Sequence, residues 1–450
     1  MNLDNLEKKY KDELSKIDEW AYIRVALGTY LLNKKGNSSS TTLIYEKIKY
    51  IFRQLLYSFY GFKFWFKKYK YLIFTDTAER RLIDGVFIDK LLEDIIERLG
   101  KDSTLMIELP NPKHYNYTDI STKNIVSHLP LKFIEKFLMY TVFNKKYNIE
   151  ILDNILLKER IDFNYINIIK SFNANYLIYK FLLKVYKPEL IFVNCHYCRF
   201  GLIYVTNELG IKTIEMQHGI INEAHFAYRS ILAINQKYLP NILLSFGENE
   251  VILKNKLIKK VFPIGSFYLE YLENNFTIDN NLFKITEQYQ YVIGVSLQDK
   301  EWEENIIFDF FIECAKEDKN ILYILIPRKR KNFSKKLPSN MIVYSDIDCY
   351  NIILHCNIHS TLYSSCALEA PSLGIPNILI DIEGFSSMYY KNILSDRHTK
   401  YATTTKEFFK VLEKIVFLDK NFIQKNNKNI FIKNYNKNIE TILKNKGKKY

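Results

Sequence analysis

Residues 357–381 read NIHSTLYSSCALEAPSLGIPNILID, in which two short apolar runs flank a stretch of helical pattern. The runs at 357–360 and 377–380 predict buried strands, and the segment 364–373 between them predicts a helix. Gly374-Ile-Pro376 then predicts a tight turn into the second strand. Strands that alternate with helices in this way favour a parallel sheet in a layered α/β fold.

The same alternation extends over most of the chain. Its later part predicts helices at 248–259, 305–318 and 349–355, and strands at 241–246, 261–264, 291–296, 321–327 and 341–344. An earlier series predicts helices at 87–99 and 174–185, and strands at 71–75, 104–109, 190–194 and 213–216.

Because the alternation restarts after Leu239-Pro240, the sequence predicts an α/β fold of two Rossmann-like domains that face each other across a cleft. An N-terminal domain with a helical start is assigned to residues 1–238, and a C-terminal domain to 239–404. The remaining residues, 405–450, are predicted to form a basic helical tail that packs across the domain junction.

Composition excludes several classes of protein. The 450 residues are 48% hydrophobic and contain only 14 Gly and 10 Pro, which argues against disordered and fibrous chains. No apolar stretch approaches the roughly 20 residues that a membrane-spanning helix needs. The N-terminus is charged and lacks the apolar core of a signal peptide, so we expect a cytoplasmic protein.

The six cysteines are too few and too scattered for a disulfide scaffold. Cys195 and Cys198 have CxxC spacing, but a structural zinc site needs four ligands and no second CxxC occurs. We therefore expect reduced thiols and no metal site.

The helix predicted after the first strand of the opening segment carries groups suited to a nucleotide. Its first turn would offer unpaired N–H groups and the positive end of the helix dipole to a phosphate. Ser364 and Ser365 could add hydroxyl donors, and Glu369, one turn further on, could accept hydrogen bonds from a ribose. Open α/β sheets bind ligands at this end of their strands. The alternative is that Ser364 only caps the helix and Glu369 is solvated.

This motif resembles the C-terminal donor domain of GT-B glycosyltransferases, in which a Glu before a G-x-P turn holds the nucleotide ribose. The resemblance covers residues 185–385 and extends to bacterial capsule and lipopolysaccharide Kdo transferases and to sialyltransferases, in which a Ser-Ser pair binds the phosphate of a CMP-sugar. Some sialyltransferases have a His-Pro pair where this chain has His359-Ser360. The resemblance implies that His359 belongs to the nucleotide-binding set with Ser364, Ser365 and Glu369.

A second motif, Gln217-His218-Gly219, follows the strand predicted at 213–216. It resembles a triplet of Kdo-transferase-type GT-B proteins. Because the pKa of an unperturbed imidazole lies near neutrality, His218 is a candidate general base or donor to a leaving phosphate, with Gln217 beside substrate. Asp76, at the end of another predicted strand, and Glu223 are alternative bases, as is Glu215.

Other strand ends supply candidate binding residues. His196 and Arg199 follow the strand at 190–194, and a guanidinium can hold an anionic substrate through two hydrogen bonds. Arg328 follows a later strand and would bring a cation to phosphate, and Gly265 lies in a turn of the kind that approaches phosphates. The alternative for Arg328 is a basic surface loop. The sequence contains no GxxxxGK[ST], GxSxG or strand-opening GxGxxG motif, which disfavours P-loop, serine-hydrolase and NAD enzymes.

The formal charge is +14, and two segments concentrate it. Residues 401–450 hold twelve Lys and four acids, and residues 45–71 interleave Lys and Arg with many aromatic rings. The second composition is typical of a membrane interface, although a core helix with a basic face would share it. We expect salt-sensitive binding to anionic lipid through rings such as Phe64, Trp65 and Phe66. No nucleic-acid partner is predicted.

Together these features predict an inverting, metal-independent glycosyltransferase without a cofactor. It would transfer a sugar, such as a Kdo-like or sialic-acid-like ulosonic acid, from a nucleotide-sugar donor to a glycan or lipid-linked glycan acceptor of capsule or lipopolysaccharide, as a peripheral enzyme at the inner membrane face. The alternatives are a CDP-polyol phosphotransferase, a UDP-sugar-dependent glycosyltransferase, a nucleotide-sugar epimerase and a noncatalytic nucleotide-binding scaffold.

Overall fold

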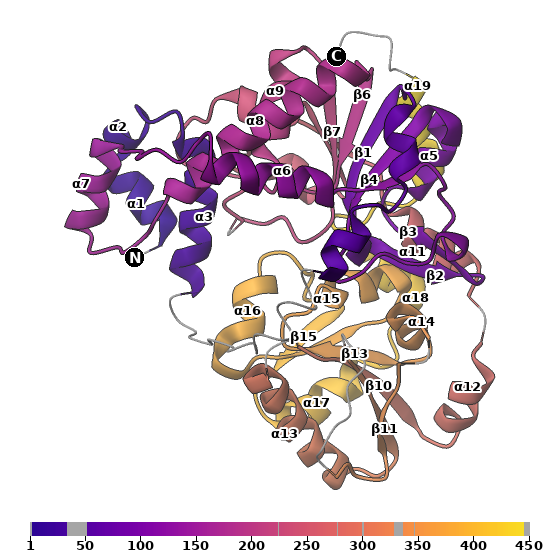
Figure 1. Ribbon diagram of the computed structural model, residues 1–450. Helices are drawn as coiled ribbons and strands as arrows, with labels where there is room; N and C mark the ends of the chain where they lie inside the picture. The colour runs from indigo at the N-terminus through magenta and orange to yellow at the C-terminus, as the bar shows by residue number, and fades with distance from the viewer. Residues whose placement is uncertain are drawn as a thin grey trace. The chain divides into compact units, whose positions relative to one another are not determined.

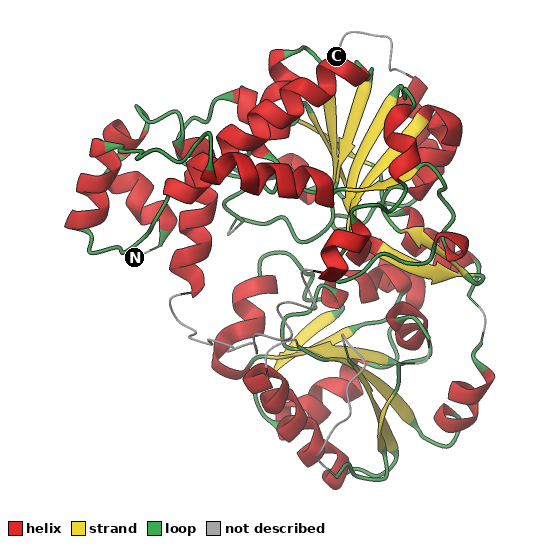
Figure 2. Cartoon of the chain, in the orientation of Figure 1, coloured by secondary structure: helices red, strands yellow, loops and turns green. Residues whose placement is uncertain are grey.

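The computed structural model describes residues 2–33, 52–223, 225–276, 278–298, 301–327, 336–345 and 347–444. The chain folds into two compact units, and each contains a parallel sheet covered by helices (Figures 1 and 2). Unit 1 comprises Met1–Ser245 and Glu250–Phe262. Unit 2 comprises Phe246–Asn249 and Pro263–Tyr450.

Unit 1 is built on a seven-stranded sheet in the order β5-β4-β1-β6-β7-β8-β9. These strands are β5 (Ile125–Ser127), β4 (Thr104–Leu109), β1 (Tyr71–Asp76), β6 (Leu190–Val193), β7 (Lys212–Met216), β8 (Ile242–Ser245) and β9 (Lys260–Pro263). All pairs from β5 to β8 are parallel. The order reverses direction between β1 and β6, and such a switch point is where open α/β sheets bind ligands.

Helices cover this sheet, and α6, α8 and α9 appear on one side of it in Figure 1. The helices assigned to this unit are α1 (Leu3–Lys9), α2 (Lys11–Leu14), α3 (Trp20–Asn33), residues 52–57, α5 (Glu93–Leu99), α6 (Leu129–Tyr140), α7 (Glu150–Lys158), α8 (Ile166–Tyr186) and α9 (Phe200–Glu208), while α10 (Asn249–Ile252) begins at the change of unit. A separate antiparallel hairpin follows β1 and consists of β2 (Arg80–Ile83) and β3 (Val86–Asp89).

Unit 2 repeats the arrangement with a six-stranded parallel sheet in the order β12-β11-β10-β13-β14-β15. Its strands are β12 (Met341–Val343), β11 (Ile321–Ile326), β10 (Tyr291–Ser296), β13 (Ile358–Thr361), β14 (Asn377–Ile380) and β15 (Thr399–Ala402). The switch point lies between β10 and β13. Both sheets therefore have the strand order of a Rossmann fold, which confirms the predicted fold class.

The helices of unit 2 include three, the last three in the chain, that the sequence assigned to a tail. They are α11 (Phe267–Asn274), α12 (Asn280–Thr286), α13 (Glu301–Glu317), α14 (Cys349–Leu354), α15 (Cys366–Glu369), α16 (Phe385–Tyr390), α17 (Thr405–Ile415), α18 (Lys420–Asn426) and α19 (Tyr435–Lys444). Phe408, Leu412 and Ile415 of α17 are buried in the core around β10 and β11. That helix is thus part of the Rossmann layer, because its apolar stripe covers the sheet.

Several sequence-based boundaries differ from the structure. The segment 87–99 is not one helix, since 86–89 form β3 and the helix begins at Glu93. The helix predicted at 248–259 is reduced to α10. The domain boundary placed at residue 238 precedes β8, which pairs with β7 and so belongs to the sheet of unit 1. Among the described residues, no helix is long and apolar enough to cross a bilayer.

Candidate functional site

The switch point of unit 1 joins the ends of β1 and β6 through two polar side chains. Asn194 Nδ2 donates to Asp76 Oδ2 over 3.1 Å, although the two residues are 118 positions apart. Asp76 Oδ1 also accepts a hydrogen bond from the Ala78 amide. Burial, and then the nearby carboxylate of Glu79, raises the pKa of Asp76. This carboxylate is therefore better suited to accept a proton than an ordinary surface aspartate.

Arg199 ties the same two strand ends together. It is the N-cap residue of α9, and its guanidinium donates to the carbonyls of Cys195 at 3.0 Å and Thr75 at 3.5 Å. Its Nε is buried without a hydrogen-bond partner in the described part of the chain. The Arg199 charge acts to lower the pKa values of Asp76 and His218. The structure thus brings Arg199 into the group formed by Asp76 and His218.

His218 lies just beyond β7 and is half-buried. Its Nε2 is 3.3 Å from the Tyr197 hydroxyl, while Nδ1 is buried with no partner among the described residues. When Tyr197 accepts a hydrogen bond from Nε2–H, Nδ1 carries a lone pair and can take a proton. Burial lowers the pKa of His218, and the carboxylates of Glu215, Glu79 and Asp76 oppose that shift.

His196, in the loop after β6, has a supporting position. It is fully buried, with Nδ1 2.8 Å from Glu215 Oε2 and its amide donating to Glu215 Oε1. The Tyr228 hydroxyl donates to the same carboxylate over 2.8 Å. Burial acts to raise the pKa of Glu215, but His196 outweighs it and the net shift is downward. The geometry therefore gives His196 the role of fixing the loops after β6 and β7, without access to a substrate.

Two further predicted residues do not join the group. Gln217 is buried and donates to the Gly219 carbonyl and to Glu250 Oε1, both over 2.9 Å, so it shapes the loop after β7. Glu223 is exposed, and no described hydrogen bond or ion pair of its carboxylate connects it with His218. Burial raises the pKa of Glu250 to about 7, a feature that the sequence analysis missed.

The switch point of unit 2 is also a hydrogen-bonded network. Thr361 at the end of β13 donates to the carbonyl of Ser296 at the end of β10, and Gln298 donates to the Thr361 hydroxyl. His359 is fully buried between Ser296 Oγ at 2.9 Å and Asn377 Oδ1 at 2.8 Å. His359 therefore fastens the strands beneath the edge, and its ring has no exposed surface to offer to a nucleotide.

The predicted phosphate and ribose groups lie at this edge. Ser364 is half-buried and accepts a 3.4 Å hydrogen bond from the Cys366 amide, whereas Ser365 is exposed and its side chain makes no cap hydrogen bond. Glu369 is half-buried, and its Oε2 has no hydrogen-bond partner among the described residues. Glu369 ends α15, and a carboxylate oxygen without a partner can accept hydrogen bonds from a diol.

The helix that carries these residues is shorter than the sequence predicted. Only four residues, Cys366–Glu369, are α-helical, and a 3-10 turn continues to Leu373. Pro371 in that turn has no amide hydrogen, which prevents a regular α-helix from continuing. The contribution of a helix dipole is therefore small, and the side chains carry the argument for an anion at this site.

The remaining predicted nucleotide ligands are placed differently. Gly265 has φ +88°, and a Cβ at this position would lie 2.4 Å from the Ile432 carbonyl oxygen. Glycine at position 265 is therefore required by the close approach of the C-terminal segment. Binding of a phosphate is not needed to explain the glycine. Arg328 lies outside the described residues.

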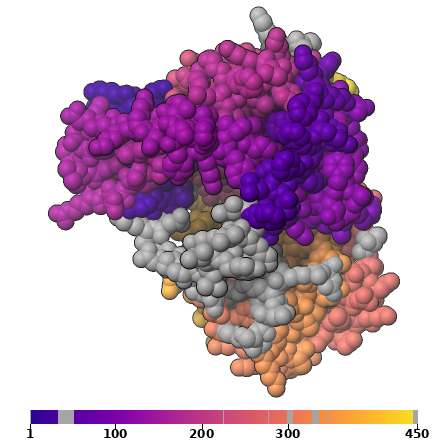
Figure 3. Space-filling view, in the orientation of Figure 1, coloured from indigo at the N-terminus to yellow at the C-terminus, as the bar shows by residue number. Residues whose placement is uncertain are grey.

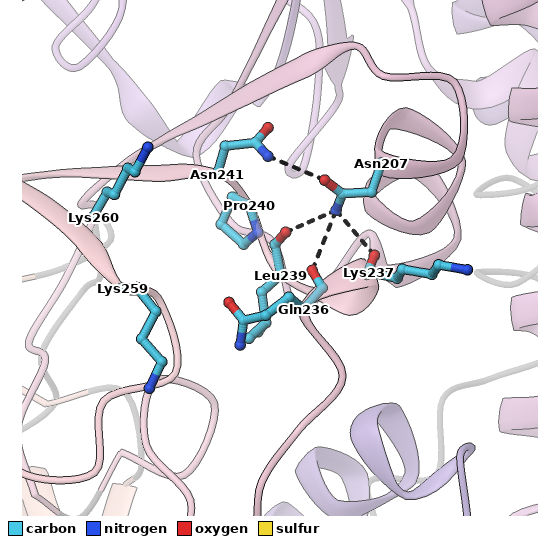
Figure 4. A pocket seen from close by; sticks show the side chains of 8 residues that line it. All are labelled: Asn207, Gln236, Lys237, Leu239, Pro240, Asn241, Lys259 and Lys260. Atoms are coloured by element: carbon cyan, nitrogen blue, oxygen red, sulfur yellow. Dashed lines mark hydrogen bonds between the residues drawn. The ribbon is translucent and has the colours of Figure 1, made fainter. Parts of the chain in front are cut away.

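A pocket of about 390 Å³ occurs at the opposite edge of the unit 1 sheet, near the beginnings of β8 and β9 (Figure 4). Asn207 spans it and donates to the carbonyls of Gln236, Lys237 and Leu239, while its own carbonyl accepts from Asn241. Its amide group is thus engaged, and the lining lysines are exposed. We assign no function to this pocket. No cluster of three or more His, Cys, Asp or Glu residues suited to a metal occurs in the described part of the chain.

Some site residues could be recognised only in the structure. Tyr197 and Cys198 lie within the loop that was already singled out for His196 and Arg199. A hydrogen bond with Cys195 lowers the pKa of Cys198 to about 7. Gln298 and Glu250 follow strand β8 or β10, but no motif distinguishes them from ordinary polar residues.

No family model matches the sequence, and no curated protein is significantly similar to it. Solved structures do share the fold. The S. aureus protein MnaA, in a co-structure with UDP, is 11% identical with a TM-score of 0.50 over 84% of this chain and 96% of its own. The UDP-GlcNAc 2-epimerase of Neisseria meningitidis, bound to UDP-GlcNAc, is 14% identical with a TM-score of 0.50 over 83% and 99%. The calicheamicin glycosyltransferase CalG4 is 10% identical with a TM-score of 0.48 over 81% and 94%, too low to add to the argument.

These similarities establish the class of fold, two Rossmann-like units arranged along the chain as in GT-B proteins. They do not single out Kdo transferases or sialyltransferases, so the narrower resemblance drawn from the sequence is not confirmed. At such low identity the shared fold does not identify the reaction of this chain. The reaction depends on the residues at each switch point.

Proposed function

We propose that this chain is a nucleotide-sugar-dependent glycosyltransferase. The observation that carries the proposal is that both switch points hold chemistry suited to that reaction. Unit 2 presents Ser364, Ser365 and the orphaned Glu369 oxygen, which suit a phosphate and a ribose. Unit 1 presents His218 and Asp76, which suit removal of a proton from a hydroxyl.

In the proposed reaction, the half-buried imidazole of His218 takes the proton of an acceptor hydroxyl as that oxygen attacks the anomeric carbon of the donor sugar. The bond between the anomeric carbon and the phosphate oxygen breaks, and the nucleotide leaves with the electron pair. Direct displacement inverts the anomeric configuration. Donors at Ser364 and Ser365 would stabilise the departing phosphate, where negative charge develops.

The donor nucleotide is the open part of this proposal. The Ser-Ser pair supports the CMP-sugar expected from the sequence, whereas the two proteins of similar fold described above were solved with UDP and with UDP-GlcNAc. We propose a bacterial surface glycan as acceptor, on the resemblance of the Gln217-His218-Gly219 and Ser364-Ser365 motifs alone. Polyol-phosphate transfer from a CDP-polyol remains the alternative within this site chemistry.

Thermal denaturation with CMP, CDP, UDP or GDP tests the binding half of the proposal. A nucleotide at 100 times its dissociation constant should stabilise the native chain by about 2.7 kcal/mol. Glu369→Gln should weaken that nucleotide about tenfold or more, because the ribose loses a charged acceptor. Glu413→Gln, an exposed change on α17, is the matched control.

No stabilisation by any nucleotide would refute the proposed nucleotide site, and would favour a scaffold that kept the fold without binding a nucleotide. If UDP stabilises the protein, incubation with UDP-GlcNAc and NMR of the sugar separates the candidates. Inversion at C2 without an acceptor would identify an epimerase and contradict the transferase, whereas an inverted glycoside formed only with an acceptor would support it.

A further inference from the structure

Apolar side chains are exposed in three segments of unit 1 that the sequence places far apart. These segments are residues 52–66, α6 with the turn that follows it, and α8. They contain 13 of the 26 large hydrophobic side chains that are exposed in the described residues. Those side chains are Phe52, Leu55, Leu56, Phe59, Phe62 and Phe66; Ile134, Phe137, Tyr140 and Val142; and Leu177, Phe181 and Val185. We call this set the apolar surface of unit 1.

The three segments adjoin one another. Helices α6 and α8 are linked by His128 Nε2 and the Tyr179 hydroxyl, 2.8 Å apart, and by a hydrogen bond from Ser171 to Glu135. The Tyr186 hydroxyl at the end of α8 donates to the Trp65 carbonyl. The Ser127 amide, just before α6, donates to the Tyr60 carbonyl over 3.0 Å. Segment 52–66 therefore lies against the strand that leads into α6 and against the end of α8. Figure 1 labels α6 and α8, and Figure 3 shows the molecular surface from the same side.

The structure also divides the rings of this segment into half-buried and exposed ones. Phe64 and Trp65 are half-buried and pack against the core formed by α8 and the sheet, so they offer less surface to lipid than the sequence suggested. Phe66 is 78% exposed and Phe59 71%. Phe181, on a helix that the sequence assigned only to the fold, is 73% exposed.

The first of these three segments is basic. Between residues 52 and 75 the chain has five basic side chains, Arg53, Lys63, Lys67, Lys68 and Lys70, and no Asp or Glu. A second copy of the chain would be a poor occupant, because a two-fold interface sets the same patch against itself and would bring like charges together. An anionic bilayer surface accepts both the rings and the cations.

We propose that the apolar surface of unit 1 seats this protein on an anionic lipid bilayer, with Phe59, Phe66 and Phe181 entering the headgroup region. The proposal does not depend on the reaction proposed above. It extends the basic aromatic segment seen in the sequence to a surface that includes α6 and α8. Because part of the attraction is electrostatic, salt should weaken it.

Sedimentation with vesicles of phosphatidylglycerol and phosphatidylcholine tests the proposal. The full chain should bind these vesicles at about 50 mM salt and much less at about 500 mM, because the Debye length shrinks as salt rises. It should not bind vesicles of phosphatidylcholine alone, because they carry no net negative charge. Phe181→Ser and Phe66→Ser should each weaken binding about tenfold, since burial of one ring is lost.

Matched controls are available for ring and charge. Leu157→Ser on α7 and Phe417→Ser in unit 2 remove side chains that are 79% and 78% exposed, and should leave binding unchanged. Lys68→Glu should weaken binding, whereas Lys158→Glu, also exposed but outside the apolar surface, should have less effect. Unchanged unfolding midpoints would exclude misfolding of the variants.

Failure to bind anionic vesicles at low salt would overturn the proposal, as would equal binding by Phe181→Ser and wild type. Analytical ultracentrifugation provides the remaining arm. A wild-type dimer that Phe181→Ser converts to a monomer would show that the occupant is a second copy of the chain, and would also overturn the lipid assignment.

Discussion

His218 is the residue on which the proposed chemistry most depends. Its Nδ1 has no hydrogen-bond partner among the described residues, whereas its Nε2 lies 3.3 Å from the Tyr197 hydroxyl. His196 and His359, which looked similar in the sequence, are fully buried, and His196 Nε2 also lacks a hydrogen-bond partner among the described residues. Partial exposure of the side chain, and not the presence of an imidazole or of an unpaired nitrogen, therefore distinguishes the candidate base.

Replacing His218 with Asn should lower turnover about 100-fold or more, because the proton acceptor is lost. Nucleotide stabilisation should persist, since the predicted nucleotide groups lie in unit 2. Glu223→Gln is the control, and it should retain activity because this side chain is exposed and separate from the group. Full activity of His218→Asn, with loss in Asp76→Asn, would move the base to Asp76.

The same assignment fixes the direction of the pH dependence. Burial lowers the pKa of His218, so the neutral, proton-accepting form persists below the ordinary value of about 6.5. Turnover should therefore stay level as pH falls to that value and decline only at lower pH. A decline beginning above pH 6.5 would contradict His218 as the base.

At the scale of elements, turns decide how the C-terminal segment is held against unit 2. Gly265 follows β9 with φ +88°, and the Ile432 carbonyl occupies the space where a side chain would begin. Gly247, after β8, is approached in the same way by the Asn429 carbonyl. These two glycines accept backbone from the segment between α18 and α19.

Gly265→Ala should destabilise unit 2 by about 1–3 kcal/mol more than Gly384→Ala, as measured by urea unfolding. Both positions have positive φ, but a Cβ at Gly384 would meet only Ser387 Oγ, at 3.7 Å. The comparison thus isolates the clash with Ile432 from the backbone strain. If Gly265→Ala folds normally and loses only nucleotide affinity, the phosphate-loop interpretation from the sequence regains support.

At the scale of the whole molecule, each unit has its own core, and the N-terminal helices belong to that of unit 1. Leu6, Trp20 and Ile23 are buried in one cluster with residues of α7 and with Leu232. Glu7 accepts a 2.6 Å hydrogen bond from Arg24, and both side chains are buried. Arg24 in turn donates to the carbonyls of Phe226 and Arg229. The loop that follows His218 is therefore anchored to the beginning of the chain.

Glu7→Ala should destabilise the protein by about 3–5 kcal/mol, because it leaves the Arg24 charge buried without its partner. Glu13→Ala, an exposed change on α2, should alter stability by about 0.5 kcal/mol or less. Chemical denaturation followed by circular dichroism gives both values. Equal effects of the two variants would show that the N-terminal helices do not support unit 1.

The sequence alone determined most strands of the two parallel sheets, although it did not predict β5 and β15 or the hairpin strand β2. The strands predicted at 104–109, 291–296 and 377–380 agree residue for residue with β4, β10 and β14. A buried parallel strand is a short continuous apolar run between turn signals, so its position is written locally. Strand β3 of the hairpin was predicted as part of a helix, because a short apolar run is compatible with either a strand or a helix.

Only the tertiary structure decided which side chains can act. Asn194 donates a hydrogen bond to Asp76 although the two residues are 118 positions apart. Both ring nitrogens of His359 are engaged by Ser296 and Asn377, because these residues lie on the two strands that flank its own. Phe66 and Phe181 are both exposed, and they belong to segments that adjoin because the end of α8 contacts residues 52–66. The periodicity of apolar residues fixes the local backbone. The exposure and the partners of a side chain depend on strands and helices that are distant in sequence, and those contacts form only in the folded protein.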